Sequence, residues 1–476
     1  MGAGSNRPGT GNTAFIVFTF NTLLAIGRPR RNGGAVLNLV ANFGAIGLHQ
    51  AGWRHPDSYR DTAMRLDHAI EVARIAEAGK MDALFLADAN GVYDMDVPEL
   101  FEANYPSARP TAFEPTTYLA AISQHTSRIG LIATATTTYD EPYLLARRFA
   151  SLDHLSNGRA AWNVVTGTNV SDARNFSHDE HVDRVTRYER SVEALEVAKG
   201  LWDSWAGDAF VQDHATGRYL DHERVRTLDH QGVHFKVQGP LNVARCPQGW
   251  PAVFLAGQSE LGLEMAAQHA DAVFAISLTV EQGRAHYADL KGRMEKYGRD
   301  PDHLRILPGA TVCVKESSAE ANDLYDELQS LISPEVGVAY LSKMIDHDLR
   351  GLPLDGPLPD LDGDVVGGSS MRAKIVDLAQ TRGLSIRKTY ESVLQAPIVL
   401  IKGNPVEVAD EIEEWYTTKA SDGFIVGAPV LPTGLEDFVR LVVPELQRRG
   451  LFRTEYAGST LRDLMGMAPA PDPWAR

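Results

Sequence analysis

Three polar residues stand where apolar segments of the chain end, and their side chains are of types that do chemistry. Asp88 and Thr134 directly follow apolar runs, and Asn163 lies near the end of a third. Carboxyl, hydroxyl and amide groups bind the polar atoms of a ligand. Structural alternatives stay open, because Asp88 could cap a helix and Thr134 belongs to a threonine-rich segment that could line a sheet.

The segment VFLAGQSELGLEMAAQH holds a second chemical feature, a turn of small residues between a strand and a helix. Ser259 is placed to cap this helix, whose free backbone N–H groups and dipole favour a phosphate group. A simple helix cap is the alternative. A serine-hydrolase nucleophile is disfavoured, because the G-x-S-x-G elbow needs glycine where the chain has Leu261, and glycine comes only at Gly262.

Histidines supply candidate acids and bases. His49 lies beside the segment WRHP, and His347 lies in IDHDLRGLPLDGPLP. Both fall in segments expected above the end of a sheet, although each could instead be a surface or capping residue. The segment HDEH at 178–181 has the residue types of a metal site but no third partner in the sequence, so we predict a solvated loop and no metal.

Strand-like and helix-like segments alternate along nearly the whole chain, which is typical of a parallel sheet covered by helices. Strands are predicted at Val36–Ala41, Ala83–Ala87, Ile129–Ala133, Ala160–Val165, Ala252–Ala256, Ala272–Ile276, Leu304–Leu307 and Gly423–Val426. Helices are predicted at Met64–Ala78, Thr116–Gln124, Leu144–Leu155, Tyr188–Trp205, Leu261–His269, Gln282–Tyr297, Pro405–Thr417 and Leu435–Arg448. About eight such units indicate a closed (β/α)8 TIM barrel of the α/β class. The open doubly wound alternative lacks both a G-x-G-x-x-G after the first strand and a P-loop.

One helix–strand unit shows how the barrel would position its chemistry. The helix Leu144–Leu155 ends shortly before Gly158, which can adopt the left-handed conformation that closes a helix, and the strand Ala160–Val165 follows. In such a barrel the carboxyl ends of the strands meet at one rim. Asp88 and Ser259 are therefore expected to face the same opening.

Two stretches interrupt the alternation and are expected to be long insertions that cover or line a site. The first, near 206–250, is polar, aromatic and rich in glycine; the second, near 333–384, is rich in Gly, Pro and Asp and is predicted to be irregular. We therefore predict a weakly structured extension over 1–34, a single barrel domain over 35–467 and a tail over 468–476.

Composition narrows the classes of function. The 476 residues are 44% hydrophobic and 23% charged, which are ordinary values for a globular protein. With 46 Lys and Arg against 62 Asp and Glu, the net charge of −16 disfavours binding to nucleic acid or to an anionic membrane. The apolar run Thr13–Ile26 is shorter than the ~20 residues of a membrane helix. The two cysteines, Cys246 and Cys313, fit a reducing cytoplasm.

Taken together, the ordered blocks of this sequence resemble the flavin-dependent monooxygenases of the bacterial luciferase-like superfamily. The most similar group is that of the nitrilotriacetate, EDTA and dibenzothiophene-sulfone monooxygenases. The resemblance runs from about Val36 to Met467 and includes AGWRHPDS, GKMDALFLAD, EPYLLARRFASLDHLSNGRAAWNVVTG, GPLNVARCPQGWPAVFLAGQSELG and GLEDFVRLVVPELQRRGLFRTEY. It implies a luciferase-like TIM barrel that binds FMN.

Carried over residue by residue, the resemblance implies that Asp88, Thr134, Tyr188 and Ser259 contact FMN. Ser259 and Tyr188 would hold the phosphate, and Asp88 and Thr134 would bond the ribityl hydroxyls or the polar edge of the ring. The family tends to have His-Asp-Glu-Arg-Tyr where this chain has RVTRY, starting at Arg184. By i, i+4 spacing Arg184 shares a helix face with Tyr188 and can pair with phosphate, whereas a role that needs imidazole is in doubt.

The same resemblance implies two catalytic residues. His347 matches a histidine near the flavin in relatives, and His49 approximately matches another. For the substrate the sequence gives only a hint, since the loop 92–113 carries the aromatic residues Tyr93, Phe101, Tyr105 and Phe113. An apolar or ring-bearing small molecule would suit such a loop, although the four residues could simply pack a lid.

The resemblance further implies a two-component reaction. Reduced FMN (FMNH2) would come from a separate NADH-dependent flavin reductase, because the chain shows no dinucleotide fingerprint. O2 would add to it, and the resulting peroxyflavin would insert one oxygen atom into a small-molecule substrate. A homo-oligomer, either dimer or tetramer, is implied by resemblance alone. Alternatives on the same scaffold are a flavin-binding protein without oxygenase turnover, a lyase that degrades flavin, and a deazaflavin-dependent dehydrogenase.

Overall fold

The computed structural model describes residues 37–44, 47–59, 64–92, 112–361, 370–394 and 398–475. The chain divides into two units, Met1–Ala35 and Val36–Arg476, and every described residue belongs to the second unit. The extension expected over 1–34 therefore lies outside the described residues.

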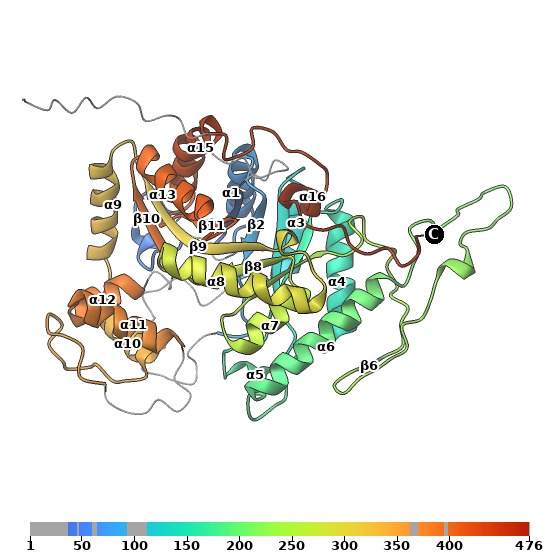
Figure 1. The fold of residues 1–476 in the computed structure, drawn as a ribbon, viewed down its shortest axis with the longest axis horizontal. Helices are drawn as coiled ribbons and strands as arrows, with labels where there is room; N and C mark the ends of the chain where they lie inside the picture. Colours follow the sequence, from blue (N-terminus) through green and yellow to red (C-terminus); the bar gives the residue numbers. More distant parts are fainter. Residues whose placement is uncertain are drawn as a thin grey trace, which may run out of the picture. The chain divides into compact units, whose positions relative to one another are not determined.

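Eight parallel strands of the second unit close into a barrel (Figure 1). They are β1 (Asn38–Asn42), β2 (Ala83–Leu86), β3 (Gly130–Thr136), β4 (Ala160–Val165), β7 (Ala252–Ala256), β8 (Ala272–Ala275), β9 (Arg305–Val314) and β11 (Gly423–Gly427). The strands pair in the order β9-β11-β1-β2-β3-β4-β7-β8, and the pairing of β8 with β9 closes the ring. The predicted TIM barrel is confirmed, and β4 and β7 have the predicted bounds.

Strand β9 is longer than predicted because it has several neighbours. Its first residues, from Arg305, pair with β8, and its second half pairs both with β11 and with a further parallel strand, β10 (Val399–Gly403). The sequence reading missed β10, which follows the second insertion and lies next to β9 outside the eight-stranded ring. After β9 the chain thus leaves the ring for the second insertion and β10, and it returns to the ring at β11.

Helices cover the outside of the barrel (Figure 1). They are α1 (Leu66–Ala78), α3 (Pro115–Ser123), α4 (Pro142–Leu155), α6 (Arg184–Trp202), α7 (Glu260–His269), α8 (Val280–Arg293), α13 (Pro405–Thr417), α14 (Thr433–Asp437) and α15 (Val443–Arg448). Gly158 closes α4 as predicted, with φ +83° and its N–H bonded to Asp153 O at 2.8 Å. Among the described helices, none is both long and apolar enough to cross a membrane.

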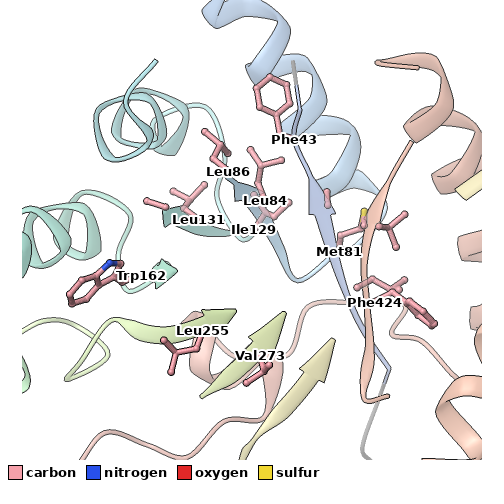
Figure 2. Close-up of a cluster of buried hydrophobic side chains, with 14 of the residues drawn as sticks. Phe43, Met81, Leu84, Leu86, Ile129, Leu131, Trp162, Leu255, Val273 and Phe424 are labelled. Atoms are coloured by element: carbon pink, nitrogen blue, oxygen red, sulfur yellow. The ribbon is translucent and has the colours of Figure 1, made fainter. Parts of the chain in front are cut away.

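The barrel interior is packed with apolar side chains from every strand, so it is not an open channel. The inward residues include Val40, Phe85, Ile132, Ala161, Phe254, Ala272, Leu307 and Ile425, and they cluster with Leu461 and Met465 of α16 (Leu461–Met465). A larger cluster fills the space between strands and helices, where Figure 2 shows Leu84, Leu131 and Trp162. Because α16 packs at the amino end of the strands, where Met465 O accepts a hydrogen bond from Arg305, the carboxyl end is left for a ligand.

Aspartates that directly precede strands link neighbouring strands at the amino end of the barrel. Asp82, Asp271 and Asp422 stand before β2, β8 and β11, and each carboxylate accepts a backbone N–H at the start of a neighbouring strand. The donors are Leu39 at 2.6 Å, Val253 at 2.8 Å and Ile306 at 3.0 Å, respectively. Asp271 also forms a bidentate ion pair with Arg462 of α16, at 3.0 and 2.8 Å. The charged groups at this end therefore have a structural role.

The first insertion contains a short antiparallel hairpin, β5 (His230–Gln231) with β6 (Lys236–Val237). The chain's last residues pack against this insertion and the end of α6. The indole N–H of Trp474 donates to Asp203 O at 3.0 Å, and the guanidinium of Arg226 lies 5.1 Å from the indole ring. The C-terminal residues thus tie the base of the insertion to the barrel.

The prediction that 333–384 is irregular is wrong. This stretch contains α10 (Pro334–Ile345) and α11 (Ser370–Arg382), which lie between α9 (Ser318–Ser330) and α12 (Ile386–Val393) in the chain. Helices α10 to α12 bury apolar side chains, among them Leu341 and Ile375, in a core of their own. The Gly, Pro and Asp residues that favoured a loop are concentrated in 351–368, between the helices.

Candidate active site

The rim at the carboxyl ends of the strands brings the predicted ligand-binding residues to one end of the barrel. Asp88 follows β2 by two positions, and Ser259 follows β7 by three. Thr134 and Asn163 lie in the second halves of β3 and β4, where they are direct register partners. Because all these strands run parallel, Asp88 and Ser259 belong to the same rim, as a shared ligand requires.

Thr134 is built into the wall of this rim. Its hydroxyl donates to Leu86 O at 2.7 Å and accepts the Asn163 Nδ2–H at 2.9 Å, and both side chains are buried. The Asn163 Oδ1 atom is also buried, and it accepts no hydrogen bond from the described residues. An unpaired buried amide oxygen costs free energy, so Asn163 has the properties of a group that meets a ligand.

Tyr188, Ser259 and two glycines form a small polar cradle at the start of α7. The Ser259 hydroxyl caps the helix by accepting the Gly262 N–H at 3.2 Å, and it donates to the Tyr188 hydroxyl at 3.2 Å. Gly257 has φ +141°, and a Cβ placed on Gly257 or Gly262 would lie 3.4 or 3.2 Å from the Tyr188 oxygen. The glycines therefore keep side chains away from the first turn of α7, whose N–H groups and dipole suit a phosphate group.

Helix α6 begins four residues earlier than predicted, so Tyr188 lies in its second turn. Arg184 is the first residue of the helix and is exposed. Arg187 instead turns inward: its NH1 donates to Val182 O at 3.0 Å, and its Nε is buried and bonds to none of the described residues. Burial lowers the pKa of Arg187. The i, i+4 argument favoured Arg184 and missed this inward cation.

Asp88 is half-buried beside two other carboxylates. Burial raises the pKa of Asp88 to about 6; repulsion from Glu114 and Asp172 adds to this, and the N–H of Ala89 opposes it. Near neutral pH a carboxyl group with this pKa is present in both protonation states, which is what acid–base chemistry requires.

The two predicted catalytic histidines have different surroundings. His49, in the loop after β1, is fully buried; its Nδ1 accepts the Ala51 N–H at 3.1 Å and its ring packs edge-on against Tyr325, with centroids 6.1 Å apart. His347 lies on an exposed turn after α10, where its backbone N–H donates to Ser342 O. Their catalytic roles stay predictions.

The HDEH segment is exposed at 178–180, whereas His181 is half-buried and forms a pair that the sequence did not signal. The Tyr139 hydroxyl bonds His181 Nδ1 at 2.7 Å, and the Tyr139 ring stacks on Phe176. Burial lowers the pKa of His181. Within the described ranges, no three His, Cys, Asp or Glu side chains come close enough together to hold a metal ion.

Of the aromatic residues predicted to line the substrate, the described residues include Phe113 alone. Its ring packs against Tyr118, with centroids 4.7 Å apart. Tyr93, Phe101 and Tyr105 lie outside the described residues. The hint of an apolar substrate therefore stays a prediction.

Comparison with known proteins identifies the class of protein to which this rim belongs. The model of the luciferase-like monooxygenase family matches residues 45–358. The chain is 45% identical over 437 residues to nitrilotriacetate monooxygenase component A of Aminobacter aminovorans, covering 91% of this chain and 96% of the relative. It is 44% identical over 433 residues to N-acetyl-S-(2-succino)cysteine monooxygenase of Bacillus subtilis (strain 168), covering 90% and 96%.

A solved structure of related sequence has the same fold as this chain. The crystal structure of riboflavin lyase with modified FMN and riboflavin has a TM-score of 0.79 and 29% identity to this chain, covering 91% of this chain and 97% of that one. The chain belongs to the luciferase-like monooxygenase family, and it is an enzyme of the monooxygenase class. The family resemblance of the sequence is confirmed.

Proposed function

We propose that this protein is an FMNH2-dependent monooxygenase that inserts one atom of O2 into a small organic substrate. The observation that carries the proposal is the contact of Tyr188 with Ser259 against the glycine turn of α7, on the same rim as Asp88. This contact supports a phosphate subsite, and Asp88, Thr134 and Asn163 supply polar groups across the opening.

The described residues fit FMN by their chemistry. Two hydroxyls and the first N–H groups of α7 suit the phosphate, and a Cβ on Gly262 would fill the space beside the Tyr188 oxygen. Thr134 and Asn163 are neutral groups of the kind that bind ribityl hydroxyls. The unpaired Asn163 Oδ1 needs a donor, which a ribityl hydroxyl or a ring N–H would supply.

When bound, the reduced flavin supplies the electrons that activate O2. The residues of the chain bind and orient it: Ser259 and Tyr188 hold the phosphate, Arg187 adds positive charge beside them, and Thr134 is fixed for its contact by the bond to Leu86. Helices α9 and α10 lie against the loop after β1, because the Tyr325 ring of α9 packs on His49 and Val336 of α10 lines a small pocket with Trp53 and Arg54. We propose that they cover the rim and exclude water.

We further propose that a separate NADH-dependent flavin reductase supplies the reduced FMN. The relative from Aminobacter aminovorans is named as component A, which supports a second component, and the sequence shows no dinucleotide fingerprint. Cys246 and Cys313 are buried free thiols, which supports a reducing compartment such as the cytoplasm. The names of the two relatives make small polycarboxylates the first substrates to test.

The test is a turnover assay with isotope-labelled O2. Purified protein is mixed with FMN, NADH and a flavin reductase, or with chemically reduced FMN, and with aminopolycarboxylates, succinylated thiols, sulfones or alkanes. We expect one labelled oxygen atom in the organic product. We expect no turnover when the reductase is omitted and NADH is the sole reductant. Steady turnover with NADH alone would contradict the two-component proposal.

Riboflavin degradation is the second candidate function, and the similarity to riboflavin lyase favours it. The same assay with riboflavin as substrate decides between the two functions. Cleavage of riboflavin, with no label in any other compound, would replace the first proposal by the second.

A further inference from the structure

We propose that Asp88 is the group that transfers protons at this rim and that Asp172 is the residue that positions it. This inference rests on the proposed monooxygenase function. It deepens that function by assigning proton transfer to a carboxyl group rather than to His49 or His347.

Carboxyl groups are grouped around the ends of β2, β3 and β4, and most have dedicated partners. The Glu114 carboxylate accepts the N–H groups of Thr116 and Thr117 at 3.0 and 2.7 Å. Asp140 lies 3.6 Å from the Arg148 guanidinium. Asp88 differs, because its only hydrogen bond within the described residues is with the N–H of Ala89. Among the described residues, Asp88 therefore has no side-chain partner of its own, unlike Glu114 and Asp140.

Asp172 holds the segment that carries Asp88. Its side chain is 4% exposed, accepts the Asn169 Nδ2–H at 2.8 Å, and also bonds the backbone of Asn90. A Cβ on Gly91 would lie 2.8 Å from the Asp172 Oδ1 atom, so the two segments pack without space for a side chain. Because Asn90 and Gly91 lie two and three positions after Asp88, this contact holds the backbone segment that carries the Asp88 carboxyl group.

Electrostatics match this geometry. Burial, together with the carboxylates of Glu114 at the start of α3 and Asp172 in α5 (Asp172–Asn175), raises the pKa of Asp88 to about 6. The N–H of Ala89 is the opposing group. By comparison, His347 lies on an exposed turn, and one ring nitrogen of the buried His49, Nδ1, is occupied by the Ala51 N–H.

The proton balance of the reaction assigns one proton-transfer step to Asp88. Overall, substrate, O2 and reduced flavin yield oxygenated substrate, water and oxidised flavin, so one oxygen atom leaves as water and takes up two protons, one of which we assign to a protein donor. Asp88 in its acid form breaks its O–H bond to donate that proton. The carboxylate then takes up one of the protons that oxidation of the reduced flavin releases, and Asp88 returns to its starting state.

The test compares Asp88→Asn, Asp88→Glu and Asp172→Asn with Asp302→Asn, a change at an exposed aspartate near the amino end of β9. Infrared titration of the flavin-free protein follows the protonated carboxyl group, fluorescence titration follows FMN affinity, and product yield is measured against pH. Asp88→Asn should remove one carboxyl group that titrates near pH 6, keep FMN affinity within about threefold, and lower product formation at least ~100-fold. Asp88→Glu should restore part of the yield.

Asp172→Asn should lower the pH at which the Asp88 carboxyl group titrates, because one repelling carboxylate is lost, whereas Asp302→Asn should change none of the readings. The inference is overturned if Asp88→Asn removes no such carboxyl group or keeps the yield of the unmodified protein. Loss of FMN affinity with an unchanged pH profile would make Asp88 a binding residue only. Failure of the unmodified protein to oxygenate any substrate would refute the proposed function, and the infrared titration would still locate the proton.

Discussion

The Ser259 hydroxyl lies 3.2 Å from the Tyr188 hydroxyl, although 71 residues separate the two in the chain. The same serine oxygen accepts the N–H of Gly262, so one atom joins α6 to the capped end of α7. A change at Ser259 therefore affects both the stability of α7 and the cradle, and the two effects have to be measured separately.

Ser259→Ala is expected to weaken FMN binding about tenfold or more, because a hydrogen bond to a charged group contributes ~1.5–3 kcal/mol. The lost helix cap should also lower the free energy of unfolding by ~1 kcal/mol. Ser385→Ala is the matched control, since Ser385 caps α12 through an equal 3.2 Å bond from the Lys388 N–H. Fluorescence titration with FMN and urea unfolding separate the effects. Equal FMN affinity in the two variants would refute the site.

Gly262→Ala should reduce FMN affinity at least ~10-fold without destabilising the protein. Its Cβ would lie 3.2 Å from the Tyr188 oxygen and 3.3 Å from the Ser259 Oγ, which forces the cradle apart. Alanine is favoured over glycine in a helix by up to ~1 kcal/mol, which offsets the cost of displacing Ser259 and Tyr188, so the free energy of unfolding should change by less than ~1 kcal/mol. A variant that binds FMN as tightly as the unmodified protein would show that the cradle is not the phosphate subsite.

Thr134→Val should lower the free energy of unfolding by ~1–3 kcal/mol, because it leaves Leu86 O and Asn163 Nδ2 without their buried partner. Thr417→Val serves as the control, since the Thr417 hydroxyl bonds Glu413 O on the exposed side of α13. Urea unfolding measures both. An equal loss in the two variants would mean that the hydroxyl at 134 does not stabilise the rim.

The pH dependence of stability should include a contribution from Asp153. Burial raises the pKa of this carboxyl group from 3.8 to about 6, against the bonds that it accepts from Ala160 and Gln248. Since the folded state binds the proton more tightly, this contribution is complete below pH ~4 and is lost as the pH rises through ~6, by up to ~3 kcal/mol. Asp153→Asn keeps an oxygen for the Ala160 N–H and the Gln248 Nε2–H, gives up the longer bond from the Gln248 backbone N–H, and should remove that slope in urea unfolding series. An unchanged slope would exclude Asp153 as its source.

The barrel strands could be predicted because each is a short apolar run bounded by turn residues. The prediction for β9 stopped at Leu307, because Pro308 and Gly309 disfavour a strand by their local preferences. The strand nevertheless continues to Val314, since β10 and β11 both pair with its second half. Local sequence carries no information about neighbours that come from β10 and β11, more than 80 residues further along the chain.

The residues of the candidate site likewise fall into those that could be predicted from the sequence and those that could not. Asp88, Thr134 and Ser259 could be placed at strand ends from the sequence, because a parallel barrel fixes where its strands end. The inward turn of Arg187 and the packing of Asp172 against Gly91 could not be predicted. They depend on contacts between loops that have no periodicity.

Helices α10, α11 and α12 pack around apolar side chains of their own, including Leu341, Ile375 and Tyr390. Replacements on the outside of this group therefore leave the packing of the eight-stranded wall intact. Because α10 belongs to the segment proposed to cover the rim, these helices are the first part of the chain to exchange when a different substrate range is wanted.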